Sequence, residues 1–94
     1  MTNFVYFYYM SKIEKLIEKL LNPGSTITFQ ELEFILSKFN YSEKKTGKTS
    51  GSRKAYINLV SKHIIRLHKP HPGNELKKYV KRYIINELKS QKLI

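Results

Sequence analysis

Two short stretches with alternating apolar and polar side chains, residues 54–59 and 63–68, constrain the fold more than any other feature of this sequence. A period of two indicates β-strands, and residues 60–62 between them are short enough for a hairpin turn. Gly-Ser at 51–52 precedes the first strand. Pro-His-Pro at 70–72 stiffens the exit from the second, because proline fixes its own φ and restricts the preceding residue. The sequence therefore predicts an antiparallel β-hairpin.

The alternation also predicts which hairpin side chains face solvent. We expect the core side to carry Ile57, Leu59, Ile65 and Leu67, and the open side to carry Lys54, Tyr56, Arg66 and His68. An aromatic ring among cations is an arrangement that proteins use to hold RNA bases and phosphates together. The hairpin is therefore the candidate working surface.

Two amphipathic segments before the hairpin, residues 11–22 and 29–39 (the second preceded by Thr28), predict helices. Each begins with the pattern Ser/Thr-x-x-Glu, which is typical of a capping box. Apolar residues recur in each at the spacing of one helical face. Asn40 stands where the second helix needs a left-handed residue, a conformation that asparagine tolerates.

Asn74 is expected to cap a last helix, residues 75–89. Its predicted core stripe is Leu76, Tyr79, Val80, Tyr83, Ile84 and Leu88, and its cationic flank is Lys77, Lys78, Lys81 and Arg82. This flank is either a solvated face or a surface for phosphates, and the helix N-terminus itself favours an anion.

Residues 41–45 alternate weakly and predict a further strand. The order helix, helix, strand, strand, strand, helix is typical of an α+β fold, with a three-stranded antiparallel sheet packed on helices. We expect residues 11–94 to form one domain. Residues 1–10 are expected to be a poorly ordered extension or an added edge strand, and Met10 is the expected natural start.

The charge of the chain is strongly positive. Lys and Arg number 18 against 7 acidic residues, a net charge of +11. Such a field favours polyanions, although a lysine-rich surface that serves only solubility has the same composition. No apolar run reaches transmembrane length, so no membrane partner is expected. Cysteine is absent, which excludes disulfides and thiolate metal sites and fits a cytoplasmic setting.

The loop from Tyr41 to Ser50 contains Lys44, Lys45 and Lys48. Its small residues would let backbone N–H groups approach a phosphate, and its lysines would supply charge. A flexible surface loop is the other interpretation of the same residues. It is not a Walker motif, because the upstream glycine is absent at the required spacing.

Five features follow one another between Thr28 and Ile94: a helix ending at Asn40-Tyr41, a basic strand or loop, Gly51-Ser52 before a strand, a second strand ending at His71-Pro72, and a last helix with a short apolar tail, Leu93-Ile94. In these features the chain resembles the HicA toxins of bacterial toxin–antitoxin pairs. The resemblance implies a fold like the double-stranded-RNA-binding domain, α-β-β-β-α, here with an extra N-terminal helix.

The resemblance also implies an endoribonuclease that cleaves mRNA without a metal or other cofactor. A HicB-type antitoxin protein would neutralise it, and oligomers would form only through that partner. The family usually carries a catalytic histidine directly after Gly-Ser or one residue later, but here these positions hold Arg53 and Lys54. Neither side chain titrates near neutral pH without a large shift of its pKa. Either the general base lies elsewhere, or the protein binds RNA without cleaving it.

The remaining candidates for proton transfer are histidines, which suit both an acid and a base near neutrality. We expect His71 and His68 to be catalytic, with His63 at the rim of the core. His71 has a second interpretation as a loop residue that hydrogen-bonds the start of the last helix. The RNA-binding candidates are Arg53, Lys54, Tyr56, Arg66, Lys48, Lys69, Lys77 and Lys78. A zinc site is not expected, because no fourth ligand lies near the histidines in sequence. A third possibility is a protein-interaction domain whose charge serves an acidic partner.

Overall fold

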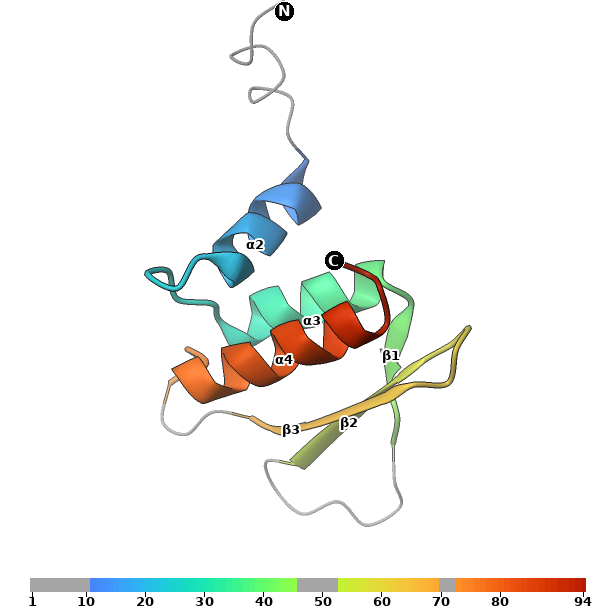
Figure 1. Cartoon of the computed structure of the whole chain (residues 1–94). Helices are drawn as coiled ribbons and strands as arrows, with labels where there is room; N and C mark the ends of the chain where they lie inside the picture. Colours follow the sequence, from blue (N-terminus) through green and yellow to red (C-terminus); the bar gives the residue numbers. More distant parts are fainter. Residues whose placement is uncertain (1–10, 46–52, 70–72) are drawn as a thin grey trace, which may run out of the picture.

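The computed structural model describes residues 11–45, 53–69 and 73–94. Within these ranges the chain is α+β, with three helices and a three-stranded open antiparallel sheet (Figure 1). The elements are α2 (Lys12–Leu21), α3 (Phe29–Lys38), β1 (Tyr41–Glu43), β2 (Arg53–Asn58), β3 (Ile64–His68) and α4 (Lys78–Ser90). The predicted class and element order are confirmed. The expectations for residues 1–10, Lys48 and His71 lie outside the described residues.

The starts of α2 and α3 follow from their capping boxes. Ser11 Oγ accepts a hydrogen bond from the backbone N of Glu14 at 3.2 Å, and a Glu14 carboxylate oxygen accepts from the backbone N of Ser11 at 2.9 Å. Thr28 and Glu31 repeat this exchange at 3.1 and 3.0 Å. Each pair satisfies two backbone donors that a helix start leaves without partners. Both predicted capping boxes are confirmed.

A left-handed residue separates α3 from the sheet, as predicted. Asn40 has φ of 70°, and β1 begins at the next residue. The sheet order is β1-β2-β3, so β2 is central and β3 is an edge strand. The registers pair Glu43 with Tyr56, Tyr56 with Ile65, and Arg53 with His68. Because β2 is the central strand, its side chains contribute to both the core-facing and the solvent-facing side of the sheet.

The core lies between the sheet and the helices, which occupy the same side of the sheet in Figure 1. α2 packs on both α3 and α4, while α3 contacts β1 and α4 contacts β3. Fully buried side chains come from every layer, namely Leu20, Ile27, Leu32, Ile35, Leu36, Ile65, Ile84 and Leu88. The core covers one face of the sheet and leaves the other face to solvent.

The phase of β2 differs from the prediction. Tyr56 and Asn58 are 4% and 5% exposed and face the helices, whereas Leu59 is 59% exposed. The buried polar groups are tolerated because they have partners. Asn58 Nδ2 donates to the carbonyl of Phe39 at 2.9 Å, and its Oδ1 accepts from the backbone N of Val60 at 2.8 Å. In β3 the predicted inward positions, Ile65 and Leu67, are confirmed.

The start of α4 also differs from the prediction, because residues 74–76 pair with another segment instead of entering the helix. Phe29 N donates to the carbonyl of Asn74 at 2.6 Å, and Leu76 N donates to the carbonyl of Ile27 at 2.8 Å. Leu76 is buried in the core at this point. The helix therefore begins at Lys78, with Lys77 as an N-cap residue whose side chain makes no capping bond.

The buried stripe of α4 is shifted from the predicted one. Lys81, expected on the cationic flank, is buried, and its Nζ donates to the carbonyls of Asn22 at 2.9 Å and Ser25 at 2.6 Å. Burial lowers the pKa of this lysine. Tyr79 and Tyr83, expected in the core, are 63% and 36% exposed. Lys81 therefore ties α4 to the end of α2, and the two tyrosines face solvent.

Candidate nucleic-acid interface

The face of the sheet that points away from the helices is the candidate surface (Figure 1). Side chains alternate along a strand, and residues paired across strands share a face. The registers therefore define this open face by residue. It comprises Ser42, Arg53, Ala55, Ile57, Ile64, Arg66 and His68.

Arg53, Arg66 and His68, here named the cationic cluster, occupy one end of the open face. Arg53 lies directly opposite His68 in the register, and Arg66 lies two residues before His68 on the same strand. Cβ atoms at such positions are about 5 to 7 Å apart. All three residues are exposed. Their side chains can therefore reach one phosphodiester group together.

No carboxylate lies on the open face, and every acidic residue of the chain falls within the described ranges. The acidic residues are Glu14 and Glu18 on α2, Glu31 and Glu33 on α3, Glu43 on the helix-facing side of β1, Glu75 before α4, and Glu87 on α4. The cationic side chains of the open face therefore have no acidic side chain beside them on that face. A polyanion is the ligand that such a surface attracts.

Two residues predicted for the open face, Lys54 and Tyr56, lie instead on the side of the sheet that faces the helices. Lys54 Nζ forms an ion pair with Glu43 at 3.2 Å, and Tyr56 Oη donates to Glu33 at 2.6 Å. With 4% of its surface exposed, Tyr56 has no free ring face on which a base can stack. The predicted stacking role of Tyr56 is wrong, because its hydroxyl finds a remote carboxylate on α3.

The environment of Tyr56 also keeps its phenol protonated. Burial raises the pKa of Tyr56 far above its usual value, and the hydrogen bond and negative charge of Glu33 raise it further, with a contribution from Glu43. The hydroxyl is therefore protonated at neutral pH and donates to Glu33. Tyr56 and Lys54 belong to the packing between β2, α3 and β1.

Of the other predicted RNA-binding residues, three lie within the described part of the chain. Lys69 is exposed directly after β3, and Lys77 and Lys78 are exposed at the start of α4. α4 has no acidic residue in its first turn, so nothing there offsets the positive end of the helix. Lys48 and His71 lie outside the described residues. Of the two predicted catalytic histidines, the structure places only His68.

His63 lies in a chain of hydrogen bonds. The sequence predicted its position at the rim of the core but not these bonds. His63 Nδ1 lies 2.7 Å from Tyr41 Oη, and His63 Nε2 lies 2.8 Å from a carboxylate oxygen of Glu87. The partners are 22 and 24 residues away in sequence, so no local pattern indicates them. Both ring nitrogens of His63 are engaged and Tyr41 is buried, which makes this chain a link between β1, the hairpin turn before β3, and α4.

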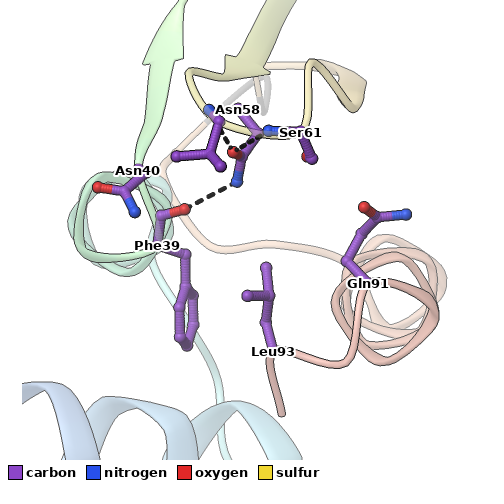
Figure 2. A pocket seen from close by; sticks show the side chains of 7 residues that line it. Phe39, Asn40, Asn58, Ser61, Gln91 and Leu93 are labelled. Atoms are coloured by element: carbon purple, nitrogen blue, oxygen red, sulfur yellow. Dashed lines mark hydrogen bonds between the residues drawn. The ribbon is translucent and has the colours of Figure 1, made fainter.

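A shallow pocket lies beside the hairpin turn, between the end of α3 and the end of α4 (Figure 2). It is lined by Phe39, Asn40, Asn58, Val60, Ser61, Gln91 and Leu93. Figure 2 shows the Asn58 amide bonded to the Phe39 carbonyl and to the hairpin turn, so its polar groups are already satisfied. No lining residue titrates near neutral pH. This pocket therefore lacks the groups that proton-transfer chemistry needs.

Three further observations concern the class of protein. Among residues 11–45, 53–69 and 73–94, no group of His, Asp and Glu side chains is arranged to hold a metal ion. In the same ranges, no helix has the length and apolar character required to cross a membrane. Comparison of the chain with models of known protein families, with curated proteins and with solved structures finds no match.

Proposed function

We propose that this protein binds RNA across the open face of its sheet and cleaves it as a HicA-like, metal-independent endoribonuclease. The observation that carries the proposal is the cationic cluster, which places an imidazole beside two guanidinium groups on a face without carboxylates. Arginine neutralises phosphates, and histidine transfers protons near neutral pH. An mRNA substrate would put this action in the cytoplasm.

The order of elements supports the same proposal. After α2, the chain runs α3, β1, β2, β3, α4, with an antiparallel sheet in sequential order. This order is compatible with the double-stranded-RNA-binding-domain-like fold that the resemblance to HicA toxins implies. Under this proposal α2 is an added N-terminal helix, and a HicB-type antitoxin is the partner that holds the activity in check.

The chemistry assigned to the cationic cluster is an internal transesterification. His68 removes the proton from a ribose 2′-hydroxyl, whose oxygen attacks the adjacent phosphorus while the bond to the 5′-oxygen breaks. Arg53 and Arg66 stabilise the negative charge that grows on the phosphoryl oxygens. His71 is the proposed acid that protonates the departing 5′-oxygen. The products are a 2′,3′-cyclic phosphate and a 5′-hydroxyl.

A non-catalytic RNA-binding module is the second candidate, and a specific observation favours it. The positions after Gly51-Ser52 hold Arg53, which is a phosphate ligand at most, and Lys54, which is paired with Glu43. In the described part of the open face, His68 is the one imidazole. If His71 is not its partner in proton transfer, the surface binds RNA without an acid–base pair.

Cleavage of single-stranded RNA by purified protein in EDTA tests the proposal. We expect wild-type protein to cut, and His68→Ala to lower the rate about 100- to 10,000-fold while RNA binding is retained. His71→Ala is expected to act similarly. Lys15→Ala, on an exposed position of α2, is the control purified in the same way and should cut at the wild-type rate.

The outcomes separate the candidates. Full activity of the His68→Ala/His71→Ala double variant would refute the catalytic assignment. Salt-sensitive binding without cleavage at any pH would favour the non-catalytic module. Absence of RNA binding at low salt would remove both candidates and favour an acidic protein partner for the surface.

A further inference from the structure

Two tyrosines on α4 are exposed where the sequence pattern places core residues. Tyr79 is 63% exposed and Tyr83 is 36% exposed. They are four residues apart, so they lie on the same face of the helix, about 6 Å apart along its axis. Large aromatic rings in water lose the burial that usually stabilises them. The pair therefore suggests a surface that a ligand covers.

Tyr83 joins this surface to the open face of the sheet. The backbone N of Arg66 in β3 donates to Tyr83 Oη at 3.3 Å. β3 is an edge strand of the sheet, and α4 contacts it. The tyrosine ring thus lies at the border between the cationic cluster and the helix layer. A ligand leaving the open face over this edge meets Tyr83 next.

The tyrosines are flanked by cations. Lys78 precedes Tyr79, Arg82 precedes Tyr83, and both cations are exposed. The acidic residue of α4, Glu87, lies four residues after Tyr83 on the same side of the helix, where its carboxylate is hydrogen-bonded to His63. Within the described residues, no carboxylate lies within ion-pair distance of Lys78 or Arg82. This part of α4 therefore combines exposed ring surface with two cations that form no ion pair among the described residues.

We infer that a single strand of RNA continues from the cationic cluster over the β3 edge onto α4, where Tyr83 and Tyr79 stack on successive bases. The inference rests on the proposed RNA-binding function and specifies its substrate class. Stacking on exposed rings requires unpaired bases, because a duplex buries the faces of its bases and presents shape and phosphates instead. Aromatic stacking also tolerates any base, so the track is expected to be lax in sequence.

Charge selects RNA over a protein as the occupant of this track. Protein interfaces are depleted in lysine at their centres, whereas single-strand tracks alternate cations with aromatic platforms. The sequence Lys78-Tyr79 and Arg82-Tyr83 repeats such a pair after one helical turn. The open face supplies phosphate ligands at the start of the track, and α4 supplies the rings.

Binding of two uncleavable oligonucleotides tests the inference. One is a single-stranded 2′-O-methyl-uridine oligomer, and the other has the same backbone and length without bases. We expect wild-type protein to bind the first more tightly. Tyr79→Leu should weaken that binding about 5- to 150-fold, the range for one stacked base, and leave binding of the abasic oligomer unchanged. Tyr79→Phe, which keeps the ring, should bind as wild type.

The salt dependence distinguishes stacking from charge. Tyr79→Leu should leave the slope of affinity against salt unchanged, whereas Arg82→Gln should lower it by about 0.7. Equal affinities of Tyr79→Leu and wild type for the uridine oligomer would overturn the inference while leaving the proposed function intact. Failure of wild-type protein to bind either oligomer would overturn both. A double-stranded RNA that competes better than the single strand would also contradict a stacking track.

Discussion

The polar side chains on the two faces of β2 differ in whether they have a partner within the protein. On the helix side, Lys54, Tyr56 and Asn58 each have a defined partner, which is a carboxylate for the first two and a carbonyl and hairpin amides for the third. On the open side, Arg53 and its neighbours across the strand, Arg66 and His68, face solvent without a carboxylate on their face. Polar groups of the first kind stabilise the fold, and those of the second kind remain available to a ligand.

This comparison predicts that substitutions on the two faces separate stability from binding. Helix-side changes should lower the free energy of unfolding, because they leave buried groups without partners. Open-side changes should leave the free energy of unfolding nearly unchanged and alter RNA affinity. Three variants test this contrast, in decreasing order of expected effect.

Asn58→Ala should have the largest effect on stability. It removes the bonds of the amide to the Phe39 carbonyl and to the hairpin amides of Val60 and Ser61. We expect the free energy of unfolding to fall by about 2 to 3 kcal/mol in urea denaturation. The exposed Asn86→Ala is the matched control and should change it by less than about 0.5 kcal/mol. Equal effects of the two substitutions would contradict the role given to the helix side.

Arg53→Gln with Arg66→Gln should change binding and not stability. Affinity for single-stranded RNA at low salt is expected to fall about tenfold or more, and the salt slope by about 1.4 for two lost phosphate contacts. Lys15→Gln with Lys38→Gln lowers the net charge equally on other surfaces. If this control lowers the affinity as much, the field of the whole protein binds RNA and the open face has no special part.

Tyr56→Phe should have the smallest effect, a loss of about 1 to 2 kcal/mol from the removed bond to Glu33. It also predicts a pH dependence. The folded protein raises the pKa of Tyr56, so this group contributes stability that is fully present below its ordinary pKa of 10.0 and is lost as pH rises further. The wild-type protein should therefore lose more stability above pH 10 than the Phe variant.

The matched control for this alkaline effect is Tyr79→Phe, because Tyr79 is 63% exposed. Its unfolding free energy should follow the wild-type dependence on pH. An identical alkaline slope for wild type and Tyr56→Phe, measured by denaturation from pH 8 to 11, would show that the bond to Glu33 does not hold the phenol proton.

Local patterns predicted the parts of the fold that depend on neighbours in sequence. Ser11 with Glu14, and Thr28 with Glu31, are three residues apart, so each capping box is readable from the chain. The left-handed Asn40 is likewise a single-residue property. The hairpin follows from its alternation, and the outward positions of Arg66 and His68 were predicted correctly with it.

The sequence-based predictions failed where the position of a residue depends on a partner that is far away in the sequence. Tyr56 and Asn58 face inward because Glu33 and the Phe39 carbonyl lie there, 23 and 19 residues away. Residues 74–76 are extended because they pair with the segment before α3. The buried stripe of α4 shifts because Lys81 reaches the carbonyls at the end of α2, more than fifty residues away. Alternation and periodicity carry no information on such pairs.

The central claim is that RNA binds the open face. Two histidines, one in β3 and one in the turn before it, allow this claim to be tested within one molecule. His68 lies in the cationic cluster, and His63 is bonded on the helix side to Tyr41 and Glu87. The most direct measurement is an NMR titration of the imidazole resonances with a single-stranded 2′-O-methyl oligonucleotide. We predict that the His68 resonances shift and saturate with RNA while those of His63 stay in place. Movement of His63 with a stationary His68 would contradict the claim.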